Sequence, residues 1–450
     1  MSRQRLGLAA ICLGFLMITV DTTAVNVALG PIVADLGGSL SGAQWIVSGY
    51  TITFATFLLS AGAWADRIGS RSAFLVGLGV FGLASAACAA APSMGTLVAA
   101  RAVQGLGAAA LMPCSLALIT HTFAAGPRRR SALAAWGGIS SIGIAVGPVL
   151  GGALVDGVGW RTIFLVNMPV AALAVAGIVA YVTETPRHRH PFDLPGQLLI
   201  VVALAGLSGG FILAGSLGWD AAATLALLAG GLLAAVGFRW VERAVPLPMI
   251  PPELFRRRQF RAVVTVGSIY NFCFYGNLFC LALYFHEELG LSPFGTGLAL
   301  LPLTLIIGTI AFSSGRLIAR LGEWRAMIIS LGGGAVAAAL MAGFGGDSVA
   351  GTILLSLPFA AVSLTMQAMT ALAMEGAPVE RIGLAAGVQN AARQAGGALG
   401  VALLGTLLAA GSGLSLRLPF ALIAALELAA LALTLYGRGR NRAALPARSQ

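Results

Sequence analysis

Residues 13–29 read LGFLMITVDTTAVNVAL, an apolar stretch that carries an aspartate, Asp21, in its interior. Its length and hydrophobicity are typical of a membrane-spanning helix. A charged side chain at the centre of a bilayer costs about 2.5 kcal/mol or more, so such a residue is by default a functional candidate. We therefore expect Asp21 to face a protein interior or a water-filled cavity, or to be protonated, and we interpret it as a candidate proton-binding group.

The composition is that of a multi-pass membrane protein. Of the 450 residues, 58% are hydrophobic and 10% are charged, whereas soluble proteins carry about 25% charged residues. No large soluble domain fits this composition. The five cysteines are scattered without metal-ligand spacing, and the chain has no phosphate-binding G-x-x-x-x-G-K-[ST] loop. We expect no metal, no cofactor and no ATP hydrolysis.

Apolar runs of about 20 residues, the length of one membrane span, recur along the whole chain. We predict fourteen helices, at 6–29, 43–62, 73–91, 96–118, 132–154, 163–182, 197–216, 222–240, 262–284, 294–314, 327–345, 349–374, 385–409 and 417–436.

The loop arginines give the orientation of these helices. The chain has no lysine, and with the N-terminus inside, twenty-three of its 27 arginines fall on the inner side. Only Arg161 and Arg417 fall on the outer side. By the positive-inside rule both termini are cytoplasmic. Membrane orientation therefore accounts for the net charge of +11, and we expect no nucleic-acid partner.

A loop sequence occurs twice. GAWADRIGSR (62–71) follows the second predicted helix, and GRLIARLGEWR (315–325) follows the tenth. If the first six and the last six helices are equivalent halves, both copies occupy the same loop, which is the usual plan of a secondary transporter. The expected division is an N-terminal six-helix bundle at 1–182, a linker with two inserted helices at 183–261, a C-terminal six-helix bundle at 262–436 and a cytoplasmic tail at 437–450.

A second intramembrane charge lies in the fourth predicted helix. Arg101, Gln104, Gly105 and Ala108 are spaced i, i+3, i+4 and i+7, so the guanidinium shares a helix face with small residues. This face must turn inward, where Arg101 can pair with Asp21 and favour release of its proton in one conformation. The alternative is a static structural ion pair.

Two glycine-rich segments are candidates for conformational gating. In the fifth helix, glycines spaced four apart permit close packing and a proline permits a kink; ordinary close packing is the alternative. In the loop after the second helix, charged residues can hold helix ends together, although positive-inside anchoring explains its arginines as well. The candidate gating residues are Asp66, Arg67, Gly69, Arg71, Gly143, Gly147, Pro148, Gly151 and Gly152.

Three further helices carry polar residues. In the ninth, Asn271, Phe272 and Tyr275 suit a large apolar or cationic ligand, although an aromatic core is an equal alternative. In the thirteenth, Arg393 is near the inner end, where its side chain can snorkel to the interface. In the fourteenth, Glu427 is too deep to reach either interface easily and is a candidate second protonation site.

Five segments together resemble the major facilitator superfamily and, within it, the fourteen-helix drug:proton antiporter family. They are 21–29, 62–71, 101–105, 143–152 (similar to the family's antiporter motif) and 159–169 (GWRTIFLVNMP). The chain departs from the family pattern at Gly30, where proline is frequent, and at Ser70, where a basic residue is frequent. The second loop copy also has Ala319 in place of the aspartate.

This resemblance implies an all-α integral membrane protein with the major facilitator fold, built from two six-helix bundles and an inserted two-helix hairpin. Helices 1, 4, 9 and 12 would line a central cavity. On this basis the proton-coupling candidates are Asp21, Arg101 and Glu427. The substrate-binding candidates are Asn26, Gln104, Asn271, Phe272, Tyr275 and Gln367.

The function that this resemblance implies is proton-coupled export of amphipathic small molecules, such as drugs, antibiotics and dyes, across the inner (cytoplasmic) membrane by alternating access. The expected partners are the substrate, protons and the lipid bilayer, and we expect a monomer. One alternative is an exporter of a single endogenous metabolite or lipid. Another is a non-transporting membrane receptor or an enzyme, but no nucleophile and base lie at matched depth, and no soluble signalling domain is present.

Overall fold

The computed structural model shows an all-helical chain. It describes residues 3–124, 126–187, 193–245, 248–250, 252–346, 348–375, 382–410 and 413–441. No β-strand occurs in these ranges. The predicted tail at 437–450 lies largely outside them, and its first residues continue the last helix to Asn441.

Fourteen helices among the described residues are long and apolar enough to cross a membrane, which confirms the predicted number. Three of the spans are composite: α6 with α7, α11 with the π-helical turn η1, and α14 with the 3₁₀ segment η2 and α15. The helices are α1 (Arg3–Leu36), α2 (Leu40–Ile68), α3 (Ser70–Ala89), α4 (Met94–Thr122), α5 (Pro127–Val158), α6 (Thr162–Leu165), α7 (Asn167–Tyr181), α8 (Leu194–Leu217), α9 (Ala222–Ala244), α10 (Pro252–Arg256), α11 (Arg258–Leu283), η1 (Tyr284–Glu288), α12 (Pro293–Leu321), α13 (Glu323–Phe344), α14 (Val349–Ser356), η2 (Leu357–Val362), α15 (Ser363–Glu375), α16 (Ile382–Leu408) and α17 (Arg417–Asn441).

The repeated loop sequence ends two equivalent helices. Gly69 follows α2 with φ +98°, and Gly322 follows α12 with φ +77°. Both glycines are therefore in a conformation that a residue with a β-carbon rarely adopts, and each allows the next helix to begin at once. The shared sequence pattern reflects this shared sharp turn.

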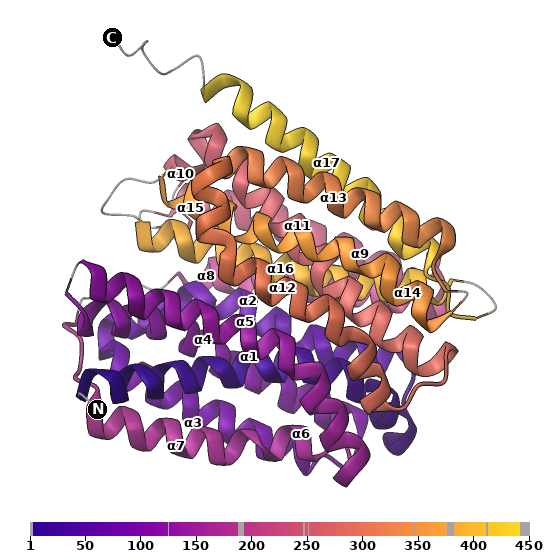
Figure 1. The fold of residues 1–450 in the computed structure, drawn as a ribbon, viewed down its shortest axis with the longest axis horizontal. Helices are drawn as coiled ribbons and strands as arrows, with labels where there is room; N and C mark the ends of the chain where they lie inside the picture. Colours follow the sequence, from indigo (N-terminus) through magenta and orange to yellow (C-terminus); the bar gives the residue numbers. More distant parts are fainter. Residues whose placement is uncertain are drawn as a thin grey trace.

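The two halves of the chain use the same helix pairings. In the N-terminal half α1 packs on α5 and α7, and α3 packs on α4 and α7. In the C-terminal half α11 packs on α16 and α17, and α13 packs on η2, α15 and α17. Figure 1 shows the halves as two layers, with the N-terminal half (indigo to magenta) below the C-terminal half (orange to yellow). The internal repeat therefore extends from the loops to the packing of the bundles.

The most extensive contacts between the halves are made by two helix pairs, α5 with α12 and α2 with α16, and α1 also touches α11 and α12. The helices α8 and α9 form a hairpin, in which α8 contacts both α2 and α16. The hairpin therefore covers one of the two seams, at the point where one half meets the other.

The halves are tightly joined on the membrane face opposite the termini. Asp156, near the end of α5, accepts hydrogen bonds from the Ser292 hydroxyl (2.8 Å) and the Phe294 backbone N–H (3.0 Å), at the start of α12. On the other seam, the Gln44 amide donates to the carbonyl of Ala402 at 2.8 Å. In α1, every residue from 21 to 29 is buried, whereas Leu16, Thr19 and Val20 are partly exposed. This structure is therefore closed on the face opposite the termini.

Backbone contact between α5 and α12 makes this closure possible. A β-carbon at Gly297 would come 2.5 Å from the carbonyl oxygen of Pro148. At Gly152 it would come 2.7 Å from the Cα of Phe294, and closer still to the carbonyl oxygen of Pro293. Because these obstacles are backbone atoms, a side chain at either position must separate the helices.

We expect Gly152→Ala to shift the protein away from the closed arrangement, because the added methyl group wedges α5 from α12. The separation of the two halves can be measured by double electron–electron resonance between spin labels on cysteines introduced at the exposed positions Val158 and Glu288. The five native cysteines are all buried, which favours selective labelling. The distance distribution should move to longer values. Gly157→Ala on the same helix, where a β-carbon meets nothing within 4 Å, is the matched control, and an unchanged distribution in Gly152→Ala contradicts the wedge.

Candidate functional site

Asp21 is buried near the middle of α1, and three side chains from other helices bind it. Its Oδ2 lies 2.5 Å from Nη1 of Arg101 on α4. Its Oδ1 accepts hydrogen bonds from the amides of Gln104 (3.0 Å) and Asn167 (2.9 Å). Only 3% of Asp21 is exposed. Both oxygens of the buried carboxylate therefore have protein partners inside the N-terminal half.

Arg101 is held as firmly as its partner. The side chain is 0% exposed, and besides Asp21 it donates to the Gln104 side-chain oxygen (2.5 Å) and the Ile46 backbone carbonyl (3.3 Å). Its guanidinium carbon lies 4.3 Å from the ring centroid of Tyr50, a cation–π distance. The predicted inward face of α4 is thus observed.

Two residues of this site were not among the predicted site residues, Asn167 at the start of α7 and Ser85 on α3. The Ser85 hydroxyl accepts hydrogen bonds from Gln104 (2.8 Å) and Asn167 (3.4 Å), and so fixes both amides that bind Asp21. The sequence signal was present, since an asparagine and a serine interrupt apolar runs there. Their depth relative to Asp21 could not be known before the helices were packed.

The geometry of the Asp21–Arg101 pair depends on the charge of the carboxylate. A proton on this carboxylate removes the charge that compensates Arg101. Leaving one partner of a buried ion pair uncompensated typically costs 3 to 5 kcal/mol, so about that much drives the guanidinium toward other partners.

Glu427 lies elsewhere, in the interior of the C-terminal half. It is 0% exposed near the middle of α17. Gly334 of α13 lies against it, since a β-carbon at that position would come 3.5 Å from the carboxyl carbon and would collide with the side chain of Val362. The thiol of Cys273 on α11 lies beside the carboxyl group, and neither carboxyl oxygen has a nitrogen or oxygen hydrogen-bond partner among the described residues. The structure does not bring Glu427 together with Asp21 and Arg101, and its role stays a prediction.

The six predicted substrate-binding residues are spread over two environments. Phe272 and Tyr275 on α11 and Gln367 on α15 are partly exposed. Gln104 is 0% exposed and bonded to Asp21, and Asn26 donates within its own helix to the Thr22 carbonyl at 3.1 Å. The sixth residue is Asn271, which is 1% exposed and bonded to its neighbours on α16. Their part in substrate binding stays a prediction.

Arg393 differs from expectation. It lies near the middle of α16, and its Nε donates to the Asn271 side-chain oxygen at 3.3 Å. The interpretation that this arginine sits at the inner end and snorkels to the interface is wrong. The sequence range of the span was correct, but the direction of the side chain depends on its partner on α11.

The predicted gating loop is anchored by a residue that sequence analysis missed. The carboxylate of Glu184, which follows α7, accepts hydrogen bonds from the backbone N–H of Arg71 (2.8 Å) and Ser72 (3.0 Å) and from the Ser72 hydroxyl (2.6 Å). It thereby caps the N-terminus of α3, where N–H groups lack intrahelical partners. A β-carbon at Gly69 would collide with this carboxylate, so glycine is required here for space as well as for its φ.

The glycines of α5 serve two different contacts. Gly143, Gly147 and Gly151 face α1, where β-carbons would collide with Thr19, Thr23 and Ala24. Pro148 and Gly152 face α12 of the other half. One side of α5 therefore packs within its bundle, and the other side meets the partner bundle. The gating role of these residues and of Asp66 and Arg67 stays a prediction.

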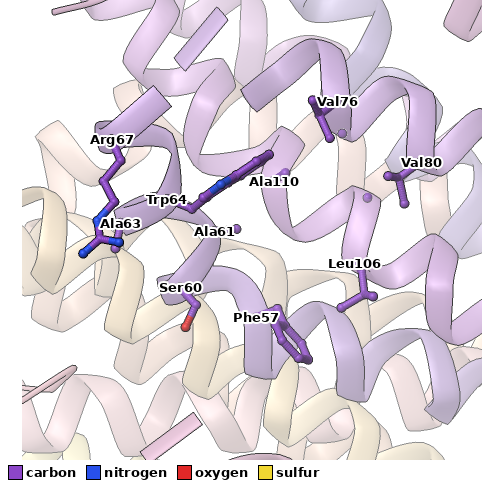
Figure 2. Close-up of a pocket in the computed structure, with 12 residues that line it drawn as sticks. Phe57, Ser60, Ala61, Ala63, Trp64, Arg67, Val76, Val80, Leu106 and Ala110 are labelled. Carbon is purple, nitrogen blue, oxygen red and sulfur yellow. The ribbon is translucent and has the colours of Figure 1, made fainter. Parts of the chain in front are cut away.

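An apolar pocket of about 300 Å³ lies between α2, α3 and α4, away from the Asp21 site. Figure 2 shows Phe57, Trp64 and Leu106 around it, with Arg67 at one side. Of the predicted site residues, Arg67 alone lines this pocket. It contains none of the predicted substrate-binding residues.

The described residues form fourteen candidate membrane spans, arranged as two equivalent bundles and a two-helix hairpin, with an ion pair buried at mid-span. This architecture defines a multi-pass transporter of the secondary type. The model of the Major Facilitator Superfamily matches residues 11–401, and the chain belongs to this superfamily.

Several relatives have names that refer to antibiotic resistance. The methylenomycin A resistance protein of Streptomyces coelicolor is 37% identical over 412 residues, which cover 89% of this chain and 85% of the relative. The tetracenomycin C resistance and export protein of Streptomyces glaucescens is 35% identical over 413 residues, which cover 90% and 76%. A crystal structure of a POT family transporter, in complex with a thioalcohol-conjugated peptide, aligns with a TM-score of 0.72 at 15% identity over 98% of this chain and 97% of that one. The structural likeness confirms the fold.

The cap on α3 gives a pH-dependent prediction. Burial raises the pKa of Glu184, but hydrogen bonds from Ser72, Thr185 and Arg71 outweigh it and hold the pKa below its ordinary value of 4.5. A lowered folded-state pKa means that the ionised cap stabilises the protein above pH 4.5, and that this contribution is lost as the pH falls through the folded-state value. Glu184→Ala should lower the free energy of unfolding by about 1 kcal/mol at neutral pH, the usual cost of a lost cap.

Thermal unfolding of the purified protein across acidic and neutral pH measures this contribution. The difference between wild type and Glu184→Ala should shrink below pH 4.5. Glu288→Ala, which removes an exposed carboxylate, controls for charge alone. A difference that stays constant down to low pH would show that the carboxylate does not act as an ionised cap.

Proposed function

We propose that the protein is a proton-coupled antiporter that exports amphipathic small molecules, including drugs, antibiotics and dyes, by alternating access. The observation that carries this proposal is the Asp21–Arg101 pair, which is buried at mid-span with its charges 2.5 Å apart. Ionisable residues at such depth usually mark ion or proton pathways. The names of relatives above 30% identity, one of which refers to export, support the substrate class and the direction.

In this proposal, Asp21 takes up a proton from the outer side and releases it inside, while the substrate moves outward. Arg101 stabilises the ionised carboxylate in one state and moves off when the proton arrives. Gln104 and Asn167 remain hydrogen-bonded to the carboxyl group in either state, because an amide can donate to a charged or a neutral oxygen. Glu427 is a candidate second proton site, and no residue is assigned a catalytic role.

Access would alternate between the two membrane faces as the contacts between the halves open and close. The contacts of Gly152 and Gly297 close the face opposite the termini, and the loop with Asp66, Arg67, Gly69 and Arg71 controls the other face. The arginine distribution supports cytoplasmic termini. The present arrangement, closed opposite the termini, is then the one that accepts substrate from the cytoplasm. We propose that the monomer in the cytoplasmic membrane is the working unit.

Asp21→Asn should abolish uphill efflux and spare downhill movement, because the amide keeps the shape of the side chain but cannot carry the proton. Proteoliposomes loaded with ethidium measure both. With a pH gradient the variant should fall to the rate of protein-free vesicles, and with a dye gradient alone it should remain active. Uphill efflux at the wild-type rate would exclude Asp21 from coupling.

A stability control separates coupling from folding. Asp21→Asn leaves Arg101 without its counter-charge and should lower the unfolding temperature, since breaking one side of a buried pair is costly. The double variant Asp21→Asn/Arg101→Gln removes both charges and should recover stability without recovering coupling. Asp21→Glu retains a titrating group and should retain part of the coupled activity. Recovery of uphill efflux in the double variant would identify the pair as purely structural.

Charge balance gives a second prediction. If one proton enters for each monocation that leaves, no net charge crosses, and the membrane potential has no effect. A neutral substrate leaves one charge uncompensated, and one elementary charge across 100 mV corresponds to about 2.3 kcal/mol. Ethidium efflux should therefore follow the pH gradient alone, whereas efflux of a neutral dye should respond to both gradients.

Glu427→Gln tests the second proton site in the same assay. We expect Asp21 to be the single proton site. Ethidium efflux should then be independent of voltage in the wild type and in Glu427→Gln alike. Proteoliposomes in which ionophores set the pH gradient and the potential independently provide the measurement. Voltage-dependent ethidium efflux in the wild type that disappears in Glu427→Gln would assign a second proton to Glu427.

A further inference from the structure

The chain places two arginines in the middle of membrane spans, and their surroundings differ. Arg101 is 0% exposed and paired with Asp21. Arg393 is partly exposed and forms no ion pair with any residue that the structure describes. An unpaired cation at this depth is costly, so a counter-charge from another source stabilises it. The position of Arg393 therefore raises the question of which group supplies its counter-charge.

Neutral side chains hold the Arg393 guanidinium in place. Its Nε donates to the Asn271 oxygen at 3.3 Å, and its Nη1 to the Asn390 oxygen at 3.4 Å. The Asn271 amide donates to Gln394 at 3.3 Å, which fixes the orientation of Asn271. The guanidinium carbon lies 5.8 Å from the ring centroid of Tyr270. These contacts position the cation without neutralising it.

The unoccupied N–H groups of the Arg393 guanidinium can bind a ligand. Nη2 has no hydrogen-bond partner among the described residues, and a guanidinium presents its donors in one plane that matches a carboxylate. Because Nε and one donor of Nη1 are already engaged, an incoming carboxylate would meet Nη2 and the remaining donor of Nη1. The positioned neighbours reduce the ordering that binding requires.

The surroundings favour an amphipathic organic anion over a bare inorganic one. Phe272 and Tyr275, partly exposed on the same stretch of α11, offer aromatic surface, and Phe274 stacks on Tyr270 with ring centroids 5.9 Å apart. Gln367 of α15 is also partly exposed. Among the described residues, the buried carboxyl groups are those of Asp21, Glu242 and Glu427. The charge of Asp21 is compensated by Arg101, and neither Asp21 nor Glu427 forms an ion pair or a hydrogen bond with Arg393.

We propose that Arg393 forms a subsite for a carboxylate on the transported molecule, so that the protein prefers amphipathic acids and zwitterions over the corresponding esters. This inference deepens the proposed export function, and it rests on that function in one respect: the molecule bound at Arg393 is the one that is exported. It adds a recognition site for an acid group to the expected binding of apolar or cationic molecules. The aromatic surface accepts the body of the molecule and Arg393 selects its acid group.

Binding of a matched dye pair tests the subsite without requiring transport. Rhodamine B carries a free carboxylate, and its ethyl ester lacks that charge but keeps the same ring system. Fluorescence anisotropy with the protein in lipid nanodiscs, against empty nanodiscs, gives both dissociation constants. The wild type should bind the acid more tightly than the ester. Arg393→Gln should weaken binding of the acid about tenfold, the scale of one charge-assisted hydrogen bond, and leave the ester unchanged or slightly tighter.

Two further variants make the result specific. Arg393→Lys keeps the charge but not the planar fork and should retain part of the preference. Arg239→Gln, at an exposed arginine of α9, should change neither constant. Equal weakening of both dyes in Arg393→Gln would make Arg393 a structural link between α11 and α16 and would overturn the subsite, as would a wild type without preference for the acid. Proton-driven efflux, measured separately, decides the export function, so the two proposals fail independently.

Discussion

The N-terminal half is organised by the requirement that a charge in hydrocarbon surroundings be compensated. Asp21 and Arg101 satisfy it with an ion pair of 2.5 Å, and two amides occupy the other carboxylate oxygen. Four of the bundle's spans must meet at one depth to build this site, because α1 contributes Asp21, α4 contributes Arg101 and Gln104, α7 contributes Asn167, and α3 contributes Ser85, which holds both amides. The site therefore fixes helix register as well as charge. In the proposed mechanism, a change of protonation at Asp21 would disturb this whole arrangement, and the pair would then couple the proton to movement as well as hold the helices together.

The C-terminal half has the same helix pairings and a different distribution of charge. Arg393 and Glu427 are both at mid-span, yet they do not pair, since Arg393 bonds to Asn271 and Asn390 while Glu427 has no partner among the described residues. The N-terminal half thus contains a buried ion pair, whereas the C-terminal half contains a partly exposed cation, Arg393, and a fully buried carboxyl group, Glu427. This asymmetry fits the two proposals above, in which the N-terminal half would exchange the proton and the C-terminal half would recognise the substrate. The halves remain mechanically linked through the α5–α12 and α2–α16 seams.

Much of the fold could be predicted from the sequence because hydropathy and arginine distribution record the position of each span. The number of helices, the repeated loop and the inward face of Arg101 all follow from local patterns, and the structure confirms them. The site was predicted in part. Asp21, Arg101 and Gln104 meet, whereas Ser85, Asn167 and Glu184 were missed because their importance depends on which residues of distant helices reach the same depth. For the same reason, the orientation of Arg393 could not be read from its position in α16.

Alternation requires closed contacts that are also easily broken, and the seam on the face opposite the termini meets this condition. Its closest contacts are made by glycine backbone at Gly152 and Gly297. Its polar contacts are single hydrogen bonds, from Ser292 and Phe294 to Asp156 at the exposed end and from Thr304 to the Ala145 carbonyl in the interior. Hydrogen bonds of this kind contribute about 1 kcal/mol each, and lipid tails are as apolar as the helices, so no large hydrophobic term opposes separation. The glycines that bind α5 to α1 instead lie on the other side of the helix. Separation at the seam therefore leaves the bundle intact, and α5 can move with α1 as one body. This is how a shift of the Asp21 carboxylate in α1 can reach the seam without unfolding either half.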